Sequence, residues 1–166
     1  YYTKEGTGKP LLLIHDLDTC TSGYEWKQLI PFLSSKYTVY TIDLLGFGRS
    51  EKANMTYTNF LYVQLISDFI KSEIGQRTSI ITSGEAASIP LMACANNPDL
   101  FDQIMAINPL SLLDFSSIPG KTAKMYKCMI ELPIIGTLLY NIASSKKMIM
   151  EELVTKKLYN PYSAKS

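Results

Sequence analysis

Short apolar runs alternate with longer amphipathic stretches over the first two thirds of the chain. The apolar runs are continuous, which is typical of strands in a parallel sheet covered on both faces, and they span 11–14, 37–42, 78–82 and 104–107. The stretches between them carry apolar residues at helical spacing and span 25–33, 60–70 and 86–96. This alternation predicts an α/β fold with a doubly wound, mostly parallel sheet, and residues 1–4 can add an edge strand.

The pattern changes after Ser111, where strand-like runs disappear and helical ones dominate up to Tyr159. Residues 1–114 carry 8 basic and 12 acidic side chains, a net charge of −4, whereas 115–166 carry 8 basic and 3 acidic ones, a net charge of +5. We therefore divide the chain into a sheet-forming segment, 1–115, and a helical segment, 116–166.

The helical segment is rich in methionine and aliphatic residues, with lysines at both ends. Three interpretations are open: helices packed on the core, a lid over an apolar pocket, or a basic amphipathic element on a membrane surface. Packed helices are the simplest of these, and a lid is their functional extension.

Composition excludes several classes of protein. A net charge of +1 over 166 residues gives no general attraction to nucleic acid. The three cysteines are scattered without a CxxC pair, so we expect no disulfide framework, metal or other cofactor. The longest apolar stretch, 129–143, is interrupted and shorter than the ~20 residues of a membrane-spanning helix. We expect a cytoplasmic protein and, because the first residue is not Met, a fragment or trimmed chain.

Three segments, in this order, resemble motifs of the α/β-hydrolase superfamily. Residues 10–16 (PLLLIHD) resemble its strand ending in His-Gly, and residues 43–50 (DLLGFGRS) resemble its D-x-x-G-x-G-x-S loop. Residues 80–88 (IITSGEAAS) stand where the family has its nucleophile elbow, G-x-S-x-G. Residues 132–136 resemble the start of its helical cap, more weakly.

The resemblance implies an incomplete sheet of the α/β-hydrolase type followed by a cap segment. It also implies that strand 11–14 lies between strands 37–42 and 78–82. The family reaction is hydrolysis of an ester, thioester or similar carbonyl substrate by a serine nucleophile, with a histidine as base and an acid to orient it.

The elbow has the small residues that its shape needs but lacks the nucleophile. Counting G-x-S-x-G from Gly84 puts Ala86 at the nucleophile position and Glu85 at the variable position before it. Registers centred on Ser83 or Ser88 are disfavoured, because glycines are missing from the flanking positions that they require.

The resemblance implies an oxyanion hole formed by the backbone N–H groups of Leu17 and Ala87 and lined by His15, Asp16, Gly84 and Glu85. Asp16 replaces the expected glycine, and its carboxylate would repel developing negative charge. His15, the only histidine in the sequence, is expected to be structural.

Without a nucleophile or a catalytic histidine, we expect the chain as written to be inactive. Three explanations remain open: an enzyme disabled at position 86 or separated from its remainder, a natural relative that binds a small apolar or acyl ligand or a partner, and a truncated gene product. An exposed sheet edge beyond 104–107 also predicts self-association.

Overall fold

The computed structural model describes residues 1–18, 21–109, 125, 128, 132–143 and 145–152. The chain separates into two compact units, Tyr1–Phe115 and Ser116–Ser166. Residues 116–120, at the start of the predicted helical segment, lie outside the described residues.

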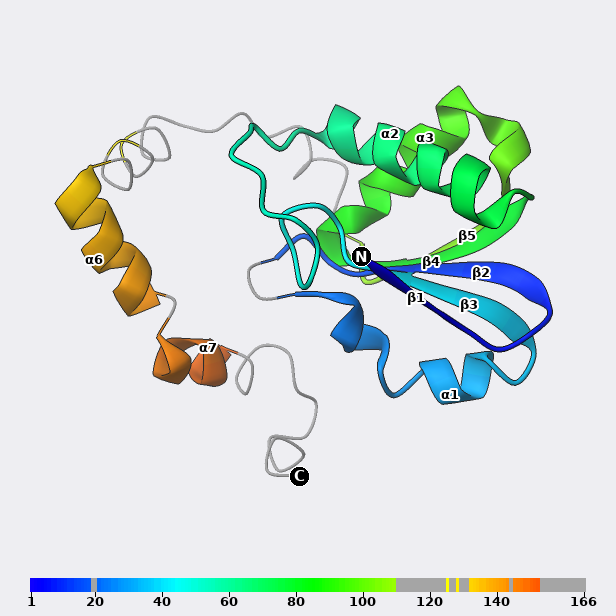
Figure 1. The fold of residues 1–166 in the computed structure, drawn as a ribbon, viewed down its shortest axis with the longest axis horizontal. Helices are drawn as coiled ribbons and strands as arrows, with labels where there is room; N and C mark the ends of the chain where they lie inside the picture. Colours follow the sequence, from blue (N-terminus) through cyan, green and yellow to red (C-terminus); the bar gives the residue numbers. More distant parts are fainter. Residues whose placement is uncertain (19–20, 110–124, 126–127, 129–131, 144, 153–166) are drawn as a thin grey trace. The chain divides into compact units, whose positions relative to one another are not determined.

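The first unit is built on a five-stranded sheet in the order β1-β3-β2-β4-β5 (Figure 1). β1 pairs antiparallel with β3, and the other pairs are parallel. The strands are β1 Tyr2–Glu5, β2 Lys9–Ile14, β3 Tyr37–Ile42, β4 Thr78–Ser83 and β5 Phe101–Ile107. The predicted order is confirmed, because β2 lies between β3 and β4 and β1 is an edge strand.

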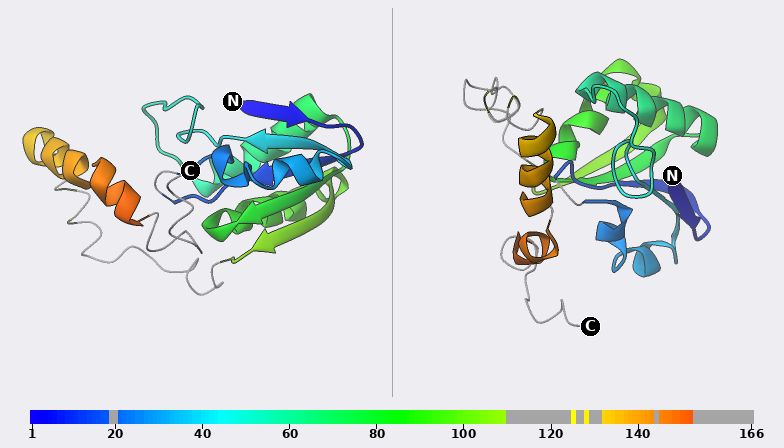
Figure 2. Two further views of the ribbon diagram at one scale, coloured as in Figure 1. Left: turned by 90° about the horizontal axis from the view of Figure 1, so that it is seen from below. Right: turned by 60° about the vertical axis from the view of Figure 1, so that its left-hand side comes forward.

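Helices cover both faces of this sheet. α2 and α3 lie on one face, whereas η1 and α1 lie on the other (Figures 1 and 2). The helical elements are η1 Gly23–Trp26, α1 Ile30–Leu33, α2 Asn59–Phe69, η2 Ile70–Ile74, η3 Gly84–Ala87, α3 Ser88–Asn96 and η4 Pro98–Leu100. The single helix predicted over 25–33 is wrong, since Pro31 lacks a backbone N–H and stands in the first turn of a new, short helix.

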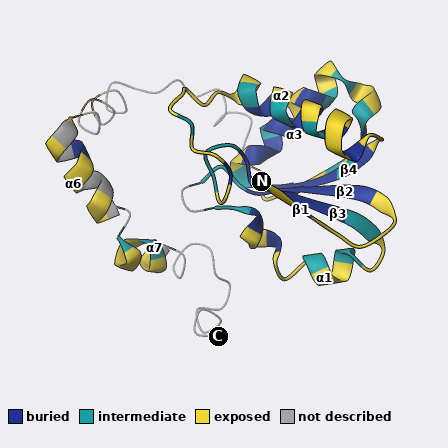
Figure 3. Ribbon diagram, in the orientation of Figure 1, coloured by how far each residue is buried: buried dark blue, intermediate teal, exposed yellow. Residues whose placement is uncertain are grey.

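Two apolar clusters explain why the central strands read as continuous apolar runs. Successive side chains of a strand point to opposite faces, so Leu12 and Ile14 pack under α2 and α3, and Leu11 and Leu13 pack with Trp26 of η1. The middle of the sheet is therefore buried on both sides (Figure 3).

The second unit contains two described helices, α6 Pro133–Ala143 and α7 Lys146–Glu152. Ile134, Leu138 and Ile142 recur every four residues on α6 and are exposed. Within the described part of the chain, no helix is both long and apolar enough to cross a bilayer.

Candidate functional site

The turn from β4 into its following helix requires a glycine at position 84. β4 ends at Ser83, and η3 begins at Gly84 and leads into α3. Gly84 has φ +55°, a left-handed conformation that side chains disfavour. A Cβ at this position would also overlap the Asp16 carboxylate. Backbone conformation and space thus both favour glycine here.

This backbone geometry changes which residue stands at the nucleophile position of the predicted elbow. In an α/β-hydrolase elbow the nucleophile itself occupies the strained residue of the strand-to-helix turn. Ala86, which sequence reasoning placed there, is fully buried, and among the described non-glycine residues only Asn108 has a positive φ. The strained position is Gly84, two residues earlier.

The Asp16 carboxylate accepts hydrogen bonds from two backbone amides, one from the next residue and one from a distant turn. Its Oδ1 accepts a hydrogen bond from the N–H of Leu17 at 2.7 Å and from the N–H of Glu85 at 2.8 Å. Sequence reasoning paired the Leu17 amide with that of Ala87, but the amide that shares an acceptor with it is that of Glu85. The sequence places Glu85 in the lining of the site, and its role as the second amide donor follows because Glu85 directly follows the glycine best suited to the strained turn.

The backbone of Asp16 is hydrogen-bonded as well as its side chain. Its N–H donates to Glu25 Oε2 at 3.1 Å, and its carbonyl accepts from Thr21 Oγ1 at 2.5 Å. The same carbonyl lies 2.6 Å from His15 Nδ1. Asp16 is half-buried at the carboxyl end of β2, so these contacts fix its carboxylate beside the turn at Gly84.

His15 links two loops at this end of the sheet. Its Nε2 accepts the backbone N–H of Leu44 at 3.0 Å, which assigns the ring proton to Nδ1 and makes Nδ1 the donor to the Asp16 carbonyl. Burial lowers the pKa of His15, partly offset by this carbonyl and by nearby carboxylates. Both ring nitrogens are engaged, as expected of a structural histidine.

Neither of the serines beside the turn is placed to act as a nucleophile. Ser83 is buried in β4, and its hydroxyl has no hydrogen-bond partner among the described residues. Ser88 Oγ donates to the Glu85 carbonyl at 3.2 Å from the first turn of α3. Neither occupies the strained turn position.

The loop after β3 is fixed by a buried carboxylate. Asp43 Oδ1 accepts the N–H of Gly23 at 2.7 Å, and its Oδ2 accepts the N–H of Arg49 at 2.8 Å. Ser50 Oγ donates to the Asp43 carbonyl at 2.5 Å. These contacts make the D-x-x-G-x-G-x-S segment a structural loop.

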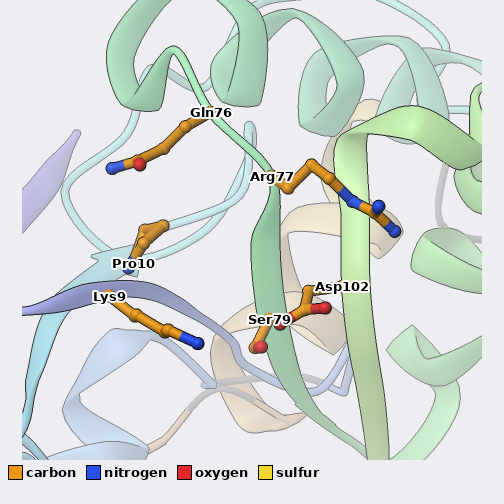
Figure 4. A pocket seen from close by; sticks show the side chains of 6 residues that line it. All are labelled: Lys9, Pro10, Gln76, Arg77, Ser79 and Asp102. Carbon is orange, nitrogen blue, oxygen red and sulfur yellow. The ribbon is translucent and has the colours of Figure 1, made fainter.

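A pocket of about 350 Å³ lies at the opposite, amino ends of the strands (Figure 4). Lys9 and Asp102 are exposed, and the Arg77 guanidinium already donates to the Phe101 carbonyl. The described residues contain no group of three His, Cys, Asp or Glu side chains placed to hold a metal ion. The candidate site is therefore the carboxyl end of β2 and β4.

Solved structures resemble this architecture closely. An α/β-hydrolase-fold protein from Burkholderia ambifaria matches with a TM-score of 0.68 and 19% identity over 86% of this chain and 52% of its own. A serine hydrolase involved in carbazole degradation matches with a TM-score of 0.64 and 24% identity over 77% of this chain and 51% of its own. This chain has the α/β-hydrolase fold.

Curated relatives of this α/β-hydrolase-fold chain include hydrolases. A 2-hydroxy-6-oxo-6-(2'-aminophenyl)hexa-2,4-dienoic acid hydrolase from Metapseudomonas resinovorans is 27% identical over 114 residues, which are 68% of this chain and 39% of the relative. A soluble epoxide hydrolase from Corynebacterium is 26% identical over 108 residues, 65% of this chain and 37% of the relative. No family model matches the sequence. The chain thus spans about two fifths of the length of these relatives.

Proposed function

We propose that this chain belongs to an α/β-hydrolase-fold protein that binds a ligand or partner and does not hydrolyse esters through a serine. One observation carries the proposal: the strained turn that holds the nucleophile in active members of the fold is occupied here by Gly84, with φ +55°. Glycine has no atom that can attack a carbonyl.

Neither nearby serine replaces the missing nucleophile, and His15 cannot activate one. The Ser83 hydroxyl is buried in the sheet, and the Ser88 hydroxyl is bonded to the backbone of its own turn. His15 is enclosed with both ring nitrogens hydrogen-bonded, so it has no free nitrogen to activate a serine or a water molecule.

The second unit, 116–166, fits the role of a cap segment in this proposal. The exposed Ile134, Leu138 and Ile142 of α6 form an apolar stripe, which is the feature that a lid over an apolar or acyl ligand requires.

An esterase assay tests the proposal. The full chain is incubated with p-nitrophenyl acetate and p-nitrophenyl butyrate, and separately with a fluorophosphonate probe that labels activated serines. We expect p-nitrophenol release at the buffer rate and no labelling. Ser83→Ala and Ser88→Ala are the matched variants, and neither should change the result. Saturable turnover or labelling that disappears in either variant would overturn the proposal.

A further inference from the structure

We propose that the amides of Leu17 and Glu85 form an oxyanion-binding site that the chain fills with its own Asp16 carboxylate. This inference rests on the proposed function, because it names what occupies the site where a reacting carbonyl oxygen would otherwise lie. Asp16 thereby acts as a built-in ligand of the carboxylate class.

The geometry is that of a bound oxyanion. Two N–H groups, one from the loop after β2 and one from the turn after β4, converge on a single oxygen at 2.7 and 2.8 Å. These distances are typical of charge-assisted hydrogen bonds to a carboxylate. They also match the spacing at which donors stabilise the oxyanion of an acyl-transfer reaction.

The occupant is held in place by its own backbone. Glu25, Thr21 and His15 hold the N–H and carbonyl of Asp16, so the carboxylate is directed at the two amides without the freedom of a surface side chain. An attached ligand competes at a high effective concentration against any dissolved anion. The Glu25 carboxylate, which accepts the N–H of Asp16, further disfavours a second negative charge.

Gly84 leaves the space that the Asp16 carboxylate occupies. The space that a nucleophile side chain would need is the space that the Asp16 carboxylate fills. The site is consequently closed to external oxyanions as long as Asp16 is present, and removing that carboxylate should open a two-amide site for small carboxylates.

The experiment follows the Leu17 and Glu85 amides by ¹H–¹⁵N NMR in the full chain. Asp16→Ala removes the carboxylate, whereas Asp16→Asn keeps an oxygen acceptor of the same shape and is the matched control. Each protein is titrated with sodium acetate, and sodium chloride at equal concentration corrects for ionic strength.

We expect acetate to shift both amides saturably in Asp16→Ala and to leave them unchanged in Asp16→Asn and in the unmodified chain. In the absence of acetate, both amides should exchange with solvent at least about tenfold faster in Asp16→Ala than in the unmodified chain. Equal acetate shifts in all three proteins, or none in Asp16→Ala, would overturn the inference.

A second measurement covers the case in which Asp16→Ala does not fold. In the unmodified chain both amides should be protected from exchange, and rapid exchange of either would contradict their bond to Asp16. These outcomes are independent of the esterase assay, so an active chain with protected amides would refute the proposed function alone.

Discussion

Residues 16 and 84 are sterically coupled although 67 positions separate them in the sequence. A glycine at position 84 meets two requirements at once. It tolerates the left-handed backbone conformation, and it leaves room for the Asp16 carboxylate. The two effects can be measured separately, because Gly75 also has a left-handed backbone but has open space around its Cβ position.

We expect Gly84→Ala to lower the free energy of unfolding by about 2–4 kcal/mol, from about 1–2 kcal/mol of left-handed strain and the loss of bonds to the displaced Asp16 carboxylate. Gly75→Ala is the control, because Gly75 has φ +71° and open space around its Cβ position. It should show the strain alone. Urea denaturation measures both, and equal losses in the two variants would contradict the steric coupling.

His15 makes stability depend on pH. Burial lowers its pKa below the ordinary value of 6.5, so the unfolded chain binds a proton more readily than the folded one as the pH falls through this range. The contribution of His15 is fully present well above pH 6.5 and is lost progressively as the pH falls through 6.5 toward the lower pKa of the folded state. We expect the free energy of unfolding to fall between about pH 7.5 and 5.5.

The comparison for this prediction is His15→Gln, which removes the only histidine in the sequence. Its unfolding free energy should depend less on pH in the same interval, as measured by urea denaturation at several pH values. Parallel pH profiles for the two proteins would assign the pH dependence to other groups.

At the scale of elements, the central strands were predictable because each is a short, continuous apolar run, and such a run between helical stretches is typical of a strand buried on both faces. The elbow register was not, because residues 83–88 are small or short at all but one position and therefore fit several alignments of G-x-S-x-G. The contact of Asp16 with Glu85 was hidden for another reason. It joins two turns that only the pairing of β2 with β4 brings together.

The loop after β3 offers a test at this scale. Asp43→Ala leaves the amides of Gly23 and Arg49 without their acceptor, and Asp43 is itself buried. We expect a loss of about 2–4 kcal/mol in the free energy of unfolding. The control is Asp68→Ala, an exposed carboxylate that accepts only a side-chain hydrogen bond from Gln64 among its described contacts. It should change stability by less than about 0.5 kcal/mol.

At the scale of the whole molecule, the sheet has an apolar edge. Among the described strands β5 pairs with β4 alone, and its Met105 and Ile107 are 60% and 43% exposed. An edge strand with apolar side chains favours pairing with another chain, whereas a lysine opposes it. We therefore predict self-association through β5.

Sedimentation velocity over a range of protein concentrations checks this prediction. Met105→Lys should shift the distribution toward monomer, whereas Leu91→Lys, which changes a similarly exposed side chain on α3, should leave it unchanged. Equal effects of the two substitutions would point to general surface hydrophobicity instead of the β5 edge.

The fit between Gly84 and Asp16 also constrains the order of mutational steps. A serine introduced at position 84 while Asp16 is present would meet the carboxylate, and the resulting chain would lose stability without gaining an open oxyanion site. Replacement of Asp16 must come first, and by itself it leaves two amides without their acceptor. Each substitution is thus unfavourable on its own, so the effect of one depends on the other, and the pair opposes the gain of a nucleophile at position 84.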